Sequence, residues 1–111
     1  MLSKSSRSNI AKLRSGTLPL NIELGRYTNV PKEQRTCKMC NYNVIEDELH
    51  FMFKCPKYLT LRLILFQKVY TKTLVDFSTM SDMEHIQFFT TDKRIIGDTS
   101  AYIRNALLLK N

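Results

Sequence analysis

Several features are scarce or missing in this sequence, and each absence excludes a class of protein. With 111 residues, the chain has room for one small domain but not for a polymerase palm, a pair of Rossmann domains or a barrel. No apolar run approaches the roughly 18 residues that span a bilayer, and the amino-terminal residues lack the apolar core of a signal peptide. The cysteine count, three, is odd, which disfavours a self-contained disulfide framework. These absences predict an intracellular protein, in the nucleus or the cytoplasm, that is not secreted.

The charge of the chain, in contrast, is strongly positive. There are 17 Lys and Arg residues against 10 Asp and Glu, a formal net charge of +7. The excess is concentrated in residues 1–40 and 56–75, and it favours a polyanionic partner, either nucleic acid or an anionic membrane surface. The residues expected to contact a phosphate backbone are Lys12, Arg14, Arg26, Arg35, Lys38, Lys57, Arg62 and Lys68. Interleaved tyrosines, which can stack on unpaired bases, are Tyr27, Tyr42 and Tyr58. The alternative is a solvated basic surface with half-buried tyrosines.

The hydrophobic pattern predicts a mostly helical fold, with a small α+β fold as the alternative. The clearest helix covers residues 56–71, because Pro56 suits a first helical position and apolar residues recur through the stretch. They occupy so much of the helix circumference that we expect other elements to surround it. A thinner pattern that stops at Gly16 predicts a helix over residues 4–15. Residues 17–27 alternate in hydrophobicity but contain a proline, which favours an extended segment or an edge strand.

Two further helices are predicted in the last third of the chain. Ser81 and Glu84 match a capping box, in which each side chain bonds to the backbone of the other at the start of a helix. Another helix follows Gly97 and covers residues 98–110. The residues on its apolar face are Tyr102, Ile103, Ala106 and Leu109. For residues 46–54 the pattern leaves strand and helix open.

All three cysteines and one histidine form a compact motif, C-x2-C-x9-H-x4-C, made by Cys37, Cys40, His50 and Cys55. A zinc ion takes four such ligands in a tetrahedron, and two thiolates separated by two residues can reach it from a single turn. Because four protein ligands leave no open position for a catalytic water, we expect a structural zinc site. The alternatives are buried thiols and a redox CxxC pair. No strand-and-helix unit of the thioredoxin kind accompanies the motif.

The neighbours of the motif fit a metal site. Asn41 follows the second cysteine, where a left-handed conformation is often needed, and asparagine tolerates that conformation. Pro56 directly follows the last cysteine, so the long helix would begin at the metal. Three thiolates and a neutral imidazole leave one net negative charge around Zn²⁺, which Arg35, Lys38 and Lys54 are placed to offset.

The sequence therefore divides into three parts of one domain. Residues 1–36 form a basic amino-terminal arm, residues 37–55 the zinc-binding segment, and residues 56–111 the helical part. The knuckle-type site is expected to link the extended arm to the helices. Of the other polar features, we expect the acidic run at residues 46–48 to stabilise the positive end of a short helix rather than to catalyse. His85 is expected to be a surface or core histidine of an amphipathic helix.

The residues around the ligands resemble a known family. A "GRY" at Gly25–Tyr27, a C-x2-C, an acidic stretch that leads into "HF" at His50–Phe51, and a "CPKY" at Cys55–Tyr58 occur in this order. This combination is similar to the cysteine–histidine segment downstream of the reverse transcriptase domain in non-LTR (LINE-like) retrotransposon polyproteins, over residues 10–70. The resemblance implies that the four motif residues bind the metal. It also implies a role in nucleic-acid handling during target-primed reverse transcription.

We therefore expect a non-enzymatic, zinc-binding fragment of such a polyprotein. The chain lacks anything that resembles the paired aspartates of a polymerase palm or an endonuclease. Its expected partners are nucleic acid, RNA or DNA, and the polymerase domain of a parent polyprotein, not a membrane or a small-molecule substrate. Two alternatives stay open. One is a zinc-stabilised protein-interaction module whose long apolar helix docks onto the missing polymerase domain, and the other is a retrotransposon relic without independent function.

Overall fold

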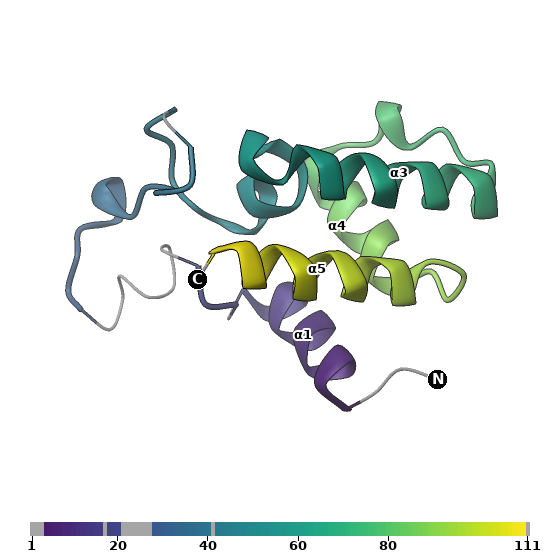
Figure 1. The fold of residues 1–111 in the computed structure, drawn as a ribbon, viewed down its shortest axis with the longest axis horizontal. Helices are drawn as coiled ribbons and strands as arrows, with labels where there is room; N and C mark the ends of the chain where they lie inside the picture. Colours follow the sequence, from purple (N-terminus) through teal and green to yellow (C-terminus); the bar gives the residue numbers. More distant parts are fainter. Residues whose placement is uncertain (1–3, 17, 21–27, 41, 111) are drawn as a thin grey trace.

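The elements of the chain are almost all helices, as the sequence predicts. The structure, a computed structural model, describes residues 4–16, 18–20, 28–40 and 42–110. Its four longer helices are α1 (Lys4–Ser15), α3 (Leu59–Thr73), α4 (Asp82–Thr91) and α5 (Ile96–Lys110) (Figure 1). In these ranges the only pairing of β type is an isolated antiparallel bridge between Thr36 and Ile45. No helix in the described part of the chain has both the length and the hydrophobicity to cross a bilayer.

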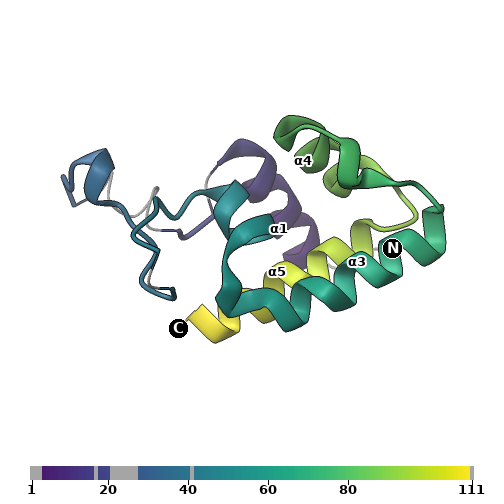
Figure 2. The same ribbon diagram turned by 90° about the horizontal axis from the view of Figure 1, so that it is seen from above.

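Helix α5 is the centre of the helical body, because it contacts α1, α3 and α4. Helix α3 lies alongside α5, and α1 crosses α5, as the two perpendicular views show (Figures 1 and 2). Small or short side chains such as Thr99, Ser100 and Ala106 are buried on α5 and let neighbouring helices approach it. Tyr102 and Ile103 are buried as predicted, whereas Leu109 is exposed. The helix begins at Ile96, so that Gly97 lies inside its first turn instead of before it.

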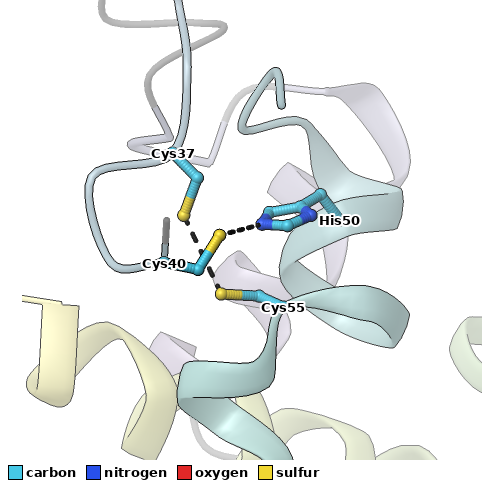
Figure 3. A group of neighbouring side chains, drawn as sticks. All are labelled: Cys37, Cys40, His50 and Cys55. Carbon is cyan, nitrogen blue, oxygen red and sulfur yellow. Dashed lines mark hydrogen bonds between the residues drawn. The ribbon is translucent and has the colours of Figure 1, made fainter. Parts of the chain in front are cut away.

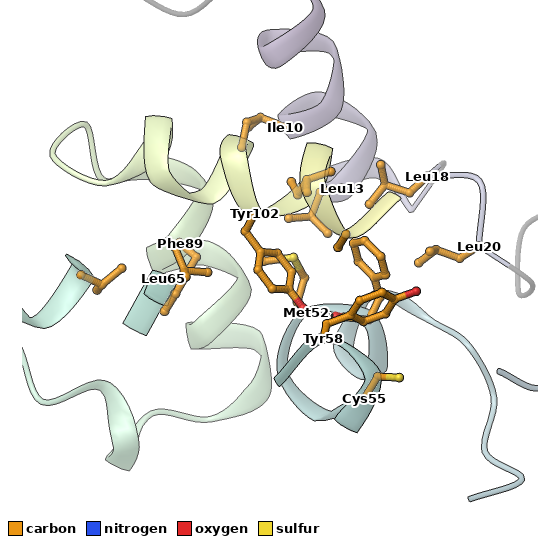
Figure 4. Packing of buried hydrophobic residues seen from close by; sticks show 14 of the residues in the cluster. Ile10, Leu13, Leu18, Leu20, Met52, Cys55, Tyr58, Leu65, Phe89 and Tyr102 are labelled. Carbon is orange, nitrogen blue, oxygen red and sulfur yellow. Dashed lines mark hydrogen bonds between the residues drawn. The ribbon is translucent and has the colours of Figure 1, made fainter. Parts of the chain in front are cut away.

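The hydrophobic core joins the amino-terminal helix to the rest of the chain (Figure 4). Ile10 and Leu13 of α1 are buried, one helical turn apart, as their spacing predicts. The segment predicted to be extended, residues 17–27, lies largely outside the described residues. Within it, Leu18 and Leu20 are described and are fully buried in the same core.

Aromatic side chains attach α4 to α3. The ring of Phe89 meets Phe53, Phe66 and Phe77 edge-on, with centroid distances of 5.3, 5.8 and 5.3 Å. This edge-to-face arrangement is the one that aromatic rings prefer. His85 takes part in the same cluster, 5.2 Å from Phe53 between ring centroids. This aromatic cluster contains most of the phenylalanines of residues 51–89: Phe53, Phe66, Phe77, Phe88 and Phe89.

The start of α4 confirms the predicted capping box. The Ser81 hydroxyl accepts a hydrogen bond from the Glu84 amide, and the Glu84 carboxylate accepts one from the Ser81 amide. Hydrogen bonding of the Ser81 amide, and of the Ser81 side chain, to the Glu84 carboxylate favours its ionised form and lowers the pKa of Glu84. The helix then continues to Thr91.

The long helix after the last cysteine begins where predicted but is not surrounded by other elements. Pro56 opens a short 3₁₀ helix, Pro56–Tyr58, which leads directly into α3. One side of α3 is buried against α5, while a second side is exposed to solvent. The exposed apolar residues of this side are Leu59, Leu63, Ile64 and Tyr70. The expectation of a surrounded helix is therefore wrong, because a domain of this size has too few elements to cover both sides.

Candidate metal centre

The four residues of the C-x2-C-x9-H-x4-C motif come together at one point (Figure 3). One ligand atom from each of Cys37, Cys40, His50 and Cys55 lies within 4.8 Å of all the others. The Sγ atoms of Cys37 and Cys55 are 3.8 Å apart, and the Cys40 Sγ is 3.4 Å from His50 Nε2. A tetrahedron with metal–sulfur bonds of about 2.3 Å and metal–nitrogen bonds of about 2.0 Å has edges of about 3.8 and 3.5 Å. These two distances therefore match the edges of a tetrahedral metal site, and the four residues could hold one metal ion.

Backbone pairing positions the two cysteines of the C-x2-C turn. The chain enters and leaves the turn as two antiparallel segments, joined by hydrogen bonds from the Cys37 amide to the Val44 carbonyl (2.8 Å) and from the Glu46 amide to the Arg35 carbonyl (3.0 Å). Inside the turn, the Met39 amide donates to the Cys37 sulfur (3.4 Å). Asn43, just after the turn, adopts the left-handed conformation with φ of 54°. The position predicted for it, Asn41, lies outside the described residues.

His50 and Cys55 reach the same point because the chain between them forms a π-helix, His50–Lys54. The Cys55 amide donates to the His50 carbonyl (2.7 Å), a bond that spans five residues. In an α-helix, residues five apart would differ by about 140° around the axis, and the two side chains would diverge. The Asp47 carboxylate accepts from the His50 amide (2.9 Å) at the start of this element. Of residues 46–54, which the sequence leaves open between strand and helix, residues 48–54 are helical.

Arg62 of α3 holds the end of the π-helix. Its Nε donates to the Met52 carbonyl (3.0 Å) and its Nη2 to the Cys55 carbonyl (2.6 Å). Only 5% of Arg62 is exposed. Its assignment to a phosphate-binding surface is therefore corrected: these backbone contacts, not solvent, surround its guanidinium. Arg62 shares an i, i+3, i+7 stripe with the buried Leu65 and Val69, which is the sequence signal that could have identified it.

Two further contacts that sequence reasoning missed connect α5 to the metal centre. The Tyr102 hydroxyl donates to the Phe51 carbonyl of the π-helix (2.6 Å). The Lys110 ammonium lies 2.8 Å from the carboxylate of Glu46, which is fully buried. Glu46 therefore pairs with α5, while Asp47 caps the start of the π-helix. No local sequence pattern indicates either contact, because both join residues far apart in the chain.

Burial of the cluster disfavours the negatively charged thiolate form of its cysteines unless a cation is bound. Burial raises the pKa of Cys37 to about 12, and it also raises the pKa of Cys55. Burial lowers the pKa of His50, which keeps its imidazole neutral. A divalent cation offsets the charge of coordinating thiolates and reverses this preference for the protonated form. Three sulfur donors and one neutral imidazole are a donor set that can hold a metal ion.

The predicted nucleic-acid contacts do not gather at the metal centre. Those on α1, the C-x2-C turn, the 3₁₀ helix and α3 have exposed side chains: Lys12, Arg14, Lys38, Lys57 and Lys68. Arg35 is half-buried and its Nε donates to the Val30 carbonyl (2.9 Å). Arg26 lies outside the described residues. Lys54, expected with Arg35 and Lys38 to offset the charge of the site, is exposed.

The tyrosines expected to stack on bases differ in their exposure to solvent. Tyr42 is exposed, on the segment that leaves the C-x2-C turn. Tyr58 is buried, in edge-to-face contact with Phe51 at a centroid distance of 5.2 Å. Its role as a stacking platform is therefore corrected, because its ring is part of the core. Tyr27 lies outside the described residues.

Comparison with known proteins identifies no relative: no family model, no curated protein and no solved structure matches the chain.

Proposed function

We propose that Cys37, Cys40, His50 and Cys55 bind one zinc ion with a structural role. The observation that supports this most directly is the agreement of two distances between donor atoms in the structure, 3.8 and 3.4 Å, with the edges of a zinc tetrahedron. Thiolates favour soft and borderline metals over magnesium or calcium. Four protein donors complete the coordination of zinc, so the ion is not a catalytic centre.

The experiment is metal analysis of the purified protein together with paired histidine variants. We expect one zinc ion per chain in the native protein and in His85→Gln, because His85 is not one of the four clustered ligand residues and its ring packs on Phe53. His50→Gln and Cys40→Ser should lose most of the metal. Cobalt in place of zinc should give the charge-transfer bands of thiolate ligation in the native protein and in His85→Gln. Equal zinc content in His50→Gln and His85→Gln would contradict the site.

We further propose that the zinc-stabilised domain binds nucleic acid and catalyses no reaction. The net charge of +7 supports binding of nucleic acid. So do the exposed lysines on α1, the C-x2-C turn, the 3₁₀ helix and α3. Such a surface acts through phosphate contacts and the release of counterions, which makes binding steeply dependent on salt. The resemblance to the cysteine–histidine segment of LINE-like retrotransposon polyproteins points to the same role. On this proposal the chain is a fragment that holds nucleic acid for a polymerase domain.

Salt titration with single- and double-stranded oligonucleotides tests the nucleic-acid proposal. About four phosphate contacts predict a log–log slope of about −3 to −4 on duplex DNA. The double variant Lys57→Ala/Lys68→Ala should flatten the slope by about 2. The matched variant Lys93→Ala/Arg104→Ala removes two exposed charges from the acidic third of the chain and should leave the slope unchanged. Absence of binding at low salt would contradict the proposal.

A protein-interaction module is the second candidate, because one side of α3 exposes Leu63 and Ile64 beside Tyr70. Adjacent exposed apolar side chains often mark an interface. If the zinc-loaded protein binds no oligonucleotide but self-associates, and Leu63→Lys makes it monomeric, this candidate replaces the first.

A further inference from the structure

A cavity adjoins the metal centre on the side of the segment that leaves the C-x2-C turn. Its volume is about 650 Å³, within the range of about 300–1,000 Å³ typical of ligand pockets. Its walls are mainly apolar and come from two segments, residues 42–45 and the stretch around the π-helix. The lining residues are Tyr42, Asn43, Val44, Ile45, Asp47, Leu49, His50 and Lys54.

The metal ligands hold both walls of this cavity. His50 itself lines one wall. The opposite wall is tied to the C-x2-C turn by the hydrogen bond from the Cys37 amide to the Val44 carbonyl (2.8 Å) and by the bridge between Thr36 and Ile45. A metal ion at the cluster would therefore fix the separation of the walls, and the cavity would be preformed when the ion is bound.

The side chains at the cavity have the chemistry that an unpaired base requires. Tyr42 is 66% exposed and offers an aromatic face for stacking. Val44 and Leu49 supply apolar walls, and the Asn43 amide has both a donor and an acceptor for a base edge. Lys54 is exposed, and its 3.9 Å pairing with Asp82 joins two exposed side chains, which leaves it able to meet a phosphate.

We propose that this cavity binds one unpaired nucleobase of a single-stranded nucleic acid, with Tyr42 stacked on the base. The inference rests on the proposed nucleic-acid binding and adds a second kind of contact to it. The charge of the chain, +7, favours a polyanion over an apolar peptide as the occupant. Asp47 also lines the cavity, but one of its carboxylate oxygens accepts from the His50 amide. A duplex keeps its bases stacked, so the cavity selects single strands.

The test compares a labelled single-stranded oligonucleotide with an abasic strand of the same length and charge, using zinc-loaded protein. The native protein should bind the base-containing strand about tenfold more tightly, the gain expected from one stacked base. Tyr42→Ala should remove this difference without a change in salt slope, zinc content or melting temperature. Tyr42→Phe keeps the ring and should behave like the native protein. Tyr70→Ala, which removes a similarly exposed tyrosine from α3, is the matched control and should also retain the difference.

The outcomes separate this inference from the proposed function. Equal binding of base-containing and abasic strands by the native protein overturns the inference and leaves backbone binding intact. Absence of binding to either strand at low salt overturns both. A 2-aminopurine base in the strand should lose fluorescence on binding the native protein but not Tyr42→Ala, which supports the inference. If the methyl resonances of Val44 and Ile45 shift with an apolar peptide and not with the strand, the cavity is a peptide groove and the inference is wrong.

Discussion

At the scale of single residues, Arg62 decides how the metal centre is attached to the helices. Its two hydrogen bonds go to the Met52 carbonyl inside the π-helix and to the Cys55 carbonyl directly after it. Arg62→Met keeps an unbranched apolar side chain but removes the Arg62 donor from the buried Met52 carbonyl and leaves the Cys55 carbonyl with only the Tyr58 amide, at 3.3 Å. We expect a loss of about 3 kcal/mol in the free energy of unfolding, measured by urea denaturation of the zinc-loaded protein. Lys68→Met, the same kind of change at an exposed position of α3, should cost less than about 0.5 kcal/mol. Similar losses in the two variants would contradict this role for Arg62.

Sequence reasoning identifies residues well when their role is local. Pro56 and the pair Ser81 and Glu84 act within a few residues of their own position, and the structure confirms each. The role of Arg62 cannot be recognised in this way, because its partners are backbone carbonyl groups of another element, and every residue type has such a group. The burial of the Tyr58 ring against Phe51 depends on how the helices pack together, which the residues around Tyr58 do not indicate.

At the scale of elements, the last turn of α5 is fixed to the segment after the C-x2-C turn by Lys110 and Glu46. The side chains of this pair are 13% and 1% exposed, so solvent screens their attraction little. A double-mutant cycle with Lys110→Met and Glu46→Gln should give a coupling energy above about 1 kcal/mol. The pair Lys54 and Asp82, which is mostly exposed, should give less than about 0.5 kcal/mol. Equal coupling in both cycles would show that burial does not strengthen the first pair.

The start of α4 gives a second prediction for an element. Ser81→Ala removes the acceptor for the Glu84 amide and breaks the capping box. We expect the free energy of unfolding to fall by about 1 kcal/mol, read from the midpoint of thermal or urea unfolding. Ser81→Asp restores an acceptor at the same position and should recover most of the loss. A failure of Ser81→Asp to recover stability would indicate that the cap is not the cause.

The extent of helix burial could not be predicted from the pattern along the chain. Apolar residues recur around α3, which suggested burial on all sides. How many sides are covered depends on the number of neighbouring elements, and α5 is the main one. The metal cluster, in contrast, could be predicted, because ligand types and their spacing carry the information. The cavity beside it could not, since its walls come from segments whose pairing is set by the fold.

At the scale of the whole molecule, the metal centre and the helical core are one structure. Cys55 and Cys37 are both ligands of the candidate site and members of the buried core. We therefore expect zinc binding to be coupled to folding. At a free zinc concentration of about a thousand times Kd, stability should rise by about 4 kcal/mol over the metal-free protein. Melting curves recorded across a zinc-buffered series measure this. A melting temperature and helicity that do not depend on zinc would contradict the coupling.

The π-helix over His50–Lys54 also has a consequence for how this segment tolerates changes of length. A π-helix carries one residue more per hydrogen-bonded ring than an α-helix. Deletion of Lys54 would leave His50 and the cysteine four residues apart, and α-helical geometry would then place both on one face. Insertion of an alanine after Lys54 would instead rotate the cysteine away from the histidine. We expect the shortened protein to keep its zinc and the lengthened protein to lose it, as metal analysis of the two would reveal. Length variation among related chains is thus expected to run toward H-x3-C and not toward H-x5-C.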